Sequence, residues 1–152
     1  MNYKKAKLYI FLIIAVLIIV NPVFFLSGCR NYDKKLDVAY FFKTEPEKTV
    51  LDFIHCLNNY DPEYIYNNFL MIKDKNNISK EKFIEEFSNI LEDVDSIAIK
   101  KVTYLGYDNE MSKVVAEFDV KYKNGETVHN KKYIYLVEES GKWKIVFDKT
   151  FI

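Results

Sequence analysis

A single change of hydrophobic period near residue 96 constrains the fold of this chain more than any other feature. Before that point, apolar residues recur at helical spacing, and after it they alternate with polar ones. The clearest case runs from Val114 to Tyr122, where every second residue is apolar or aromatic and most of the others are charged. A period of 3.6 indicates amphipathic helices, and a period of two indicates half-buried strands. Helices followed by strands predict a segregated α+β domain.

Each of the three predicted helices begins at a recognisable N-cap. Thr44 and Glu47 have the spacing of a capping box, in which each side chain meets the other residue's backbone amide. Asp61 precedes Pro62, a pair typical of the first turn of a helix, and Ser79 opens the third helix. We expect these helices over residues 44–59, 61–70 and 79–94.

Four strands with short connections are expected to follow. A bulge is expected in the first strand near Lys100, and Asn124-Gly125 is a signal for a type I′ hairpin turn between the second and third. Ser140-Gly141 marks the last turn, after which Trp143, Ile145 and Phe147 alternate toward the C-terminus. We expect the strands over residues 97–107, 114–123, 126–138 and from 143 to the end of the chain.

In this order and spacing, the chain from 44 to 152 resembles the nuclear transport factor 2-like superfamily of cystatin-like cone folds. The resemblance implies three helices packed in the concave face of a curved four-stranded antiparallel sheet. Similar domains occur in small bacterial lipoproteins and at the N-terminal side of some penicillin-binding proteins. The matching stretches are Pro46–Val50, Asn59–Glu63, Ser79–Phe83 and Gly141–Ile145.

The N-terminus has the three parts of an export signal: lysines, a long apolar run over 8–26, and small residues. Leu26-Ser27-Gly28-Cys29 resembles the lipobox of bacterial lipoproteins. That resemblance implies a diacylglyceryl group on the thiol of Cys29 and cleavage between Gly28 and Cys29. The chain would then comprise a signal peptide over 1–28, a lipidated tether over 29–43 and one domain over 44–152.

An uncleaved membrane anchor is the alternative, because the apolar run is long enough to span a bilayer. Either arrangement places the domain outside the cytoplasmic membrane, since the lysines stay inside. The many Lys, Asn and Ile residues are typical of an AT-rich genome, which suits a Gram-positive host. With Cys29 acylated, the chain is expected to hold no internal disulfide. Membrane contact is thus expected through lipid on Cys29.

The sequence predicts no catalytic constellation, no cofactor and no metal site. The 22 basic residues balance the 22 acidic ones, so no basic field favours nucleic acid. Two histidines and two cysteines offer no metal-ligand spacing. Cys56 is interpreted as a core residue, and Asp119 is expected to face solvent because the apolar set of its strand faces inward.

Aromatic residues on the sheet have two interpretations, since they either pair across strands in the core or line an apolar ligand pocket. The leading hypothesis is a non-catalytic envelope module that binds an unknown envelope protein or a small ligand. A small isomerase or dehydratase using the cone pocket is the alternative, and an accessory role in cell-wall synthesis rests on the resemblance alone. The predicted pocket residues are His55, Tyr104, Phe118, Tyr133, Tyr135 and Trp143.

Overall fold

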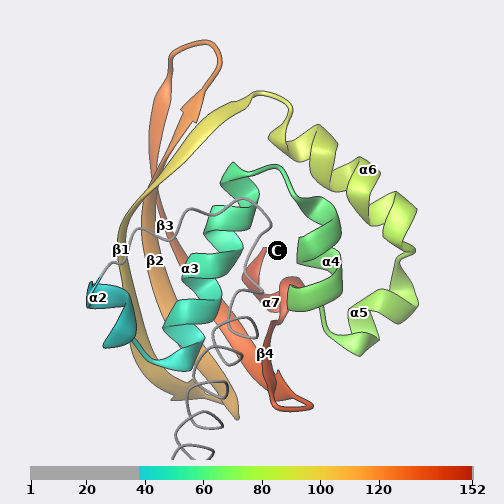
Figure 1. Ribbon diagram of the computed structural model, residues 1–152, viewed down its shortest axis with the longest axis vertical. Coiled ribbons are helices and arrows are strands. Elements are labelled where there is room, and N and C mark those ends of the chain that lie inside the picture. The colour runs from blue at the N-terminus through green and yellow to red at the C-terminus, as the bar shows by residue number, and fades with distance from the viewer. Residues whose placement is uncertain (1–37, 152) are drawn as a thin grey trace, which may run out of the picture.

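The computed structural model describes residues 38–151 (Figure 1). The predicted lipobox, with Gly28 and Cys29, lies outside these residues. Among the described residues, no helix has both the length and the apolar character needed to cross a membrane.

Four antiparallel strands form one curved sheet in the order β1-β2-β3-β4, which confirms the predicted α+β class. The long strands β1, β2 and β3 bend together around the helices (Figure 1). The register of β1 shifts between Ile99 and Lys101, so the bulge expected near Lys100 is present. The strands span Val94–Asp108 (β1), Met111–Tyr122 (β2), Thr127–Glu139 (β3) and Lys142–Ile145 (β4).

The three expected helices are present, with three short helices in addition. Thr44 and Glu47 form the capping box, and the side chains of Asp61 and Ser79 accept hydrogen bonds from the first turns of their helices. The short α2 is held by Tyr40, whose hydroxyl donates to the carboxylate of Asp52. The helices are Val38–Phe41 (α2), Glu45–Asn58 (α3), Pro62–Phe69 (α4), Ile72–Asn77 (α5), Lys80–Leu91 (α6) and Phe147–Thr150 (α7).

The helices lie on the concave side of the curved sheet, as expected, but at different distances from it (Figure 1). Helix α3 packs directly on β1 and β2, whereas α6 packs mainly on α4, farther from the sheet (Figure 1). The core between α3 and the sheet is closed by fully buried side chains, among them Val50, Val114 and Leu136. The interior of the cone is therefore filled, and open space is found between the helices instead.

Two hydrogen bonds from Asn58 tie the end of α3 to the outer edge of β1. Its side-chain amide donates to the carbonyl of Ile97 at 2.5 Å, and its side-chain oxygen accepts from the Ile97 amide at 2.6 Å. Tyr60, two residues on, takes a left-handed conformation (φ 50°) that closes α3, and its hydroxyl donates to the carbonyl of Val94. These contacts cover backbone groups that a free edge strand would expose.

The expected fourth strand is wrong beyond Ile145, because the chain leaves the sheet there. The amide of Val146 still donates to the carbonyl of Tyr135, at 2.8 Å. The chain then turns into α7, and the Thr150 hydroxyl accepts from the Tyr135 amide at 3.2 Å. A side chain of α7 thus satisfies the backbone group that a longer β4 would have paired, and Phe147 moves off the sheet.

The turn between β2 and β3 also differs from the expected type I′. Only Gly125 of the Asn124-Gly125 pair has a positive φ, of 89°. The Gly125 amide donates to the carbonyl of Tyr122, and the Tyr122 amide donates to the carbonyl of Glu126. This is a three-residue loop with glycine at a left-handed bulge position.

Candidate functional site

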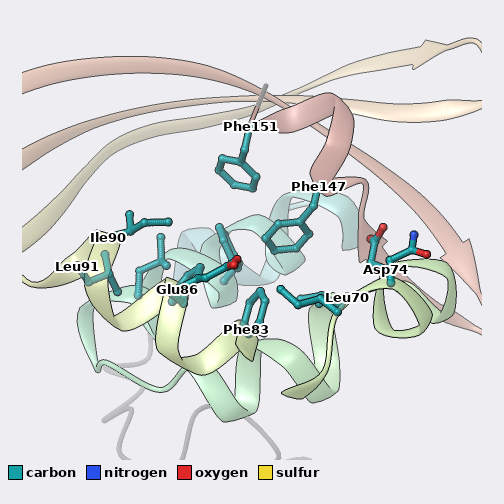
Figure 2. A pocket seen from close by; sticks show the side chains of 13 residues that line it. Leu70, Asp74, Phe83, Glu86, Ile90, Leu91, Phe147 and Phe151 are labelled. Atoms are coloured by element: carbon teal, nitrogen blue, oxygen red, sulfur yellow. The ribbon is translucent and has the colours of Figure 1, made fainter. Parts of the chain in front are cut away.

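A pocket of about 570 Å³ lies between the helices, and no residue of strands β1–β4 lines it (Figure 2). Its volume is in the range of small-molecule sites. Ten of the lining side chains are apolar, and they come from α3, α6, α7 and the segment around α5. The lining residues are Phe53, Leu57, Leu70, Asp74, Asn77, Ile78, Phe83, Glu86, Phe87, Ile90, Leu91, Phe147 and Phe151.

Aromatic rings from distant parts of the chain meet at this pocket. The ring of Phe147 lies 6.0 Å from that of Phe53 and 6.2 Å from that of Phe83, both nearly edge to face. Phe151 lies 5.1 Å from Phe147. Such contacts favour a defined ring arrangement over a loose apolar surface. Helix α7 thus supplies one wall of the pocket.

Part of the apolar lining remains open to solvent. Ile90 of α6 is 72% exposed and Phe151 is 47% exposed. Apolar side chains that are exposed next to one another, rather than singly, are typical of binding surfaces. The pocket therefore has an accessible, apolar rim.

Asp74 of α5 is the polar group in this pocket with an unsatisfied buried atom. Its Oδ2 is buried and has no hydrogen-bond partner within residues 38–151. Burial raises the pKa of the Asp74 carboxyl, and the negative charge of Asp148 adds to the increase, whereas Lys73 opposes it. Lys73 instead pairs with Asp148, at 2.9 Å. Folded proteins leave few buried acceptors unsatisfied in this way.

The other two polar lining groups are Glu86 and Asn77. Glu86 reaches from α6 toward the pocket interior, while Asp74 lies at the end formed by α5 (Figure 2). The Glu86 carboxylate is 3.7 Å from the amine of Lys82, and its side chain is 56% exposed. No lysine, arginine or histidine among the described residues lines the pocket. The lining is therefore apolar with a negative bias.

None of the six predicted pocket residues lines this pocket. His55 is half-buried in the last turn of α3, and Tyr133 is 47% exposed on β3. Lys113 places its amine 5.0 Å from the ring centroid of Tyr133 and 5.3 Å from that of Tyr135, a cation–π arrangement. The remaining three are half-buried and pack against the core: Tyr104, Phe118 and Trp143.

Asp119 and His129 form a polar pair on the face of the sheet opposite the core. The Nδ1 of His129 is 2.8 Å from the Asp119 carboxylate, and the amine of Lys100 is 3.1 Å from it. The hydrogen bond with His129 and the ion pair with Lys100 lower the pKa of Asp119. Asp119 therefore does not point into a cavity, as expected from the alternation of its strand.

Cys56 is fully buried on α3, as predicted for a core residue, and is not available as a surface thiol. The Cys56 sulfur is disulfide-bonded. The expectation of no internal disulfide is therefore wrong for this structure.

Comparison with known proteins identifies the domain type. A family model described as an NTF2-like N-terminal transpeptidase domain matches residues 45–152. The solution structure of a SEC-C motif containing protein from Rhodopseudomonas palustris is similar, with TM-score 0.51 and 11% identity over 66% of this chain and 74% of that one. A crystal structure from Novosphingobium aromaticivorans, described as a "putative aromatic ring hydroxylase", gives TM-score 0.47 and 13% identity over 66% and 81%. At such identity the likeness concerns the fold alone. The search of curated proteins found no match.

Proposed function

The chain belongs to the family of NTF2-like N-terminal transpeptidase domains, and we propose that it is a lipid-anchored binding module on the outer face of a bacterial membrane. In this proposal the domain takes a small apolar ligand, or an apolar part of an envelope protein, into the pocket between its helices. It catalyses no reaction. The single observation that carries the binding role is the open, apolar pocket of about 570 Å³.

The anchor is supported by the lipobox and by the physics of acyl chains. Two chains at about 0.8 kcal/mol per buried CH₂ group hold a protein firmly at a membrane, whereas one holds it only marginally. The chain contains two cysteines. A thioether and a disulfide cannot share the sulfur of Cys29, so lipidation and a bond from Cys56 to Cys29 are alternatives that experiment can separate.

Metabolic labelling with an alkyne analogue of palmitate in a Gram-positive host tests the anchor. We expect label on the wild type and on Cys56→Ala, each shortened by the signal peptide, and none on Cys29→Ala. Label that persists on Cys29→Ala would contradict the proposal. So would mass spectrometry of membrane-extracted protein that finds Cys29 joined to Cys56 in place of an acylated Cys29.

The non-catalytic role is supported by the composition of the pocket lining. General acid–base catalysis needs a titratable group held in place within hydrogen-bond reach of the proton that it transfers. The described lining offers Asp74 and Glu86, and Glu86 is largely exposed beside Lys82.

An isomerase or dehydratase is the second candidate, and the raised pKa of Asp74 is the observation that favours it. Its test is deuterium exchange into small carbonyl compounds in D₂O, followed by NMR. Exchange that is faster with the wild type than with Asp74→Asn would favour the enzyme over the binding module.

Binding can be tested with the full chain in lipid nanodiscs and a long-chain alcohol that carries a photoreactive diazirine. We expect labelling of peptides from α6 and α7. Ile90→Asp puts a charge at the pocket rim on a residue that is already 72% exposed, so it should reduce labelling without unfolding the domain. Leu105→Asp is the matched control, because Leu105 is 50% exposed on β1 and does not line the pocket. Equal labelling of both variants and the wild type would refute the pocket as the binding site.

A further inference from the structure

We infer that the pocket selects an elongated apolar molecule with a positively charged head that donates hydrogen bonds, of the long-chain alkylammonium type. This inference rests on the proposed binding function and adds the chemistry of the ligand. The apolar body would lie along Phe83, Phe87 and Phe147, and the head would meet Asp74 at the α5 end (Figure 2).

The first argument is the unsatisfied oxygen of Asp74. A buried acceptor without a partner costs about 1–3 kcal/mol, and folded proteins leave few such groups. The neighbouring lysines are engaged elsewhere. Lys73 pairs with Asp148 at 2.9 Å, and the amine of Lys75 donates to the carbonyl of Asn67 at 2.9 Å. Asp74, at the α5 end of the pocket, therefore carries a buried acceptor that neither neighbouring lysine satisfies.

The second argument is the sign of the charge around the pocket. Its described lining contains two carboxylates, Asp74 and Glu86, and no basic side chain. Asp148 and Glu139 add negative charge near Asp74 and raise the pKa of its carboxyl, whereas Lys73 adds positive charge and lowers it. A fatty acid would bring a further carboxylate into this field, whereas an ammonium group would complement it. The same acids would repel an anionic lipid headgroup.

The third argument is the division of the pocket into an apolar body and a polar end. Small-molecule sites are commonly mostly apolar, with a few polar groups that fix the ligand's orientation. Here Asp74 and Asn77 form the polar end at α5, Glu86 adds one carboxylate from the middle of α6, and the remaining lining is aliphatic or aromatic. This arrangement fits an amphiphile better than a compact polar metabolite.

The test uses three diazirine probes of equal chain length that end in an amine, a hydroxyl or a carboxylate. Each labels the full chain in nanodiscs, as wild type, Asp74→Asn and Asp95→Asn. Asp95 is a matched control, because it lies on β1 and pairs with Lys121 outside the pocket. Comparing each probe between protein variants cancels differences in how the probes partition into lipid.

We expect Asp74→Asn to reduce labelling of α6 by the amine about tenfold or more, the range of a lost hydrogen bond to a charged group. Labelling by the alcohol should change little, labelling by the carboxylate should rise, and Asp95→Asn should behave as the wild type. Amine labelling that is unchanged in Asp74→Asn refutes the inference while leaving the binding function in place. If the alcohol fails to label the wild-type pocket at all, the binding function itself fails.

Discussion

Replacing Asn58 by alanine tests whether one side chain holds α3 to the edge of the sheet. The two hydrogen bonds of Asn58 satisfy both backbone groups of Ile97, a residue that is only 7% exposed. No strand pairs with β1 on that side in the described part of the chain. In Asn58→Ala the amide and the carbonyl of Ile97 lose their partners together.

The expected cost follows from the burial of these groups. A buried backbone group without a partner costs about 1–3 kcal/mol, and partial entry of water reduces that, so we expect a loss of about 2–4 kcal/mol for the pair. For a domain of this size that corresponds to a decrease of roughly 8–16 °C in Tm. Asn58→Asp should be at least as harmful at neutral pH, because a carboxylate would face the Ile97 carbonyl without a proton to donate.

Thermal and urea unfolding followed by circular dichroism measure this effect. Asn59→Ala is the control, since Asn59 is exposed and makes only backbone contacts at the end of α3. Asn59→Ala should change the free energy of unfolding by no more than about 0.5 kcal/mol. If Asn58→Ala lowers the free energy of unfolding no more than Asn59→Ala does, the Asn58 side chain does not stabilise the edge of β1, and the reasoning is refuted.

Two further substitutions test other parts of the structure. Asp74→Asn should stabilise the domain by about 0.5–1 kcal/mol at pH 7, since the raised pKa means that the ionised carboxyl costs folding free energy. That gain should disappear as the pH falls through the raised pKa of Asp74 toward the ordinary aspartate range. Urea unfolding at pH 7 and in acid measures it, and a difference in unfolding free energy between Asp74→Asn and the wild type that stays constant with pH would contradict this account. Thr44→Ala should lower the free energy of unfolding by about 1 kcal/mol, because it removes the capping box of α3. Thr44→Ser keeps the hydroxyl and should retain most of that stability. Equal midpoints for alanine and serine at position 44 would contradict the role of the hydroxyl.

The sequence predicts most of the fold because its signals are local. The caps at Thr44, Asp61 and Ser79 depend on residues three positions away, and the alternation of β2 depends on one strand. The end of β4 depends on a distant partner, because Thr150 meets Tyr135 only after the sheet has formed. Alternation of Trp143, Ile145 and Phe147 therefore could not reveal where the strand stops.

The pocket was harder to predict, because it too depends on tertiary contacts and not on a local signal. The apolar stripe of α6 identifies Phe83, Phe87 and Ile90 as inward-facing, but the same pattern is produced by a filled core and by an open pocket. The exposure of Ile90, 72%, is a tertiary property. Asp74 lies in a polar stretch with no periodic signal, so nothing local distinguishes its half-buried carboxylate from its solvated neighbours.

The pocket and the short β4 have one structural cause. If β4 continued in its observed register, with Ile145 opposite Leu136, then Phe147 would lie opposite Ile134 on the sheet. The chain instead leaves the sheet at Val146, which brings Phe147 and Phe151 to Phe53 and builds one wall of the pocket. The Thr150 hydroxyl stabilises this departure from the sheet, because it accepts a hydrogen bond from the Tyr135 amide, which a longer β4 would have paired. A change that weakens the hydrogen bond between Thr150 and Tyr135 should therefore displace the pocket wall formed by α7 before it disturbs the strand pairing of the sheet.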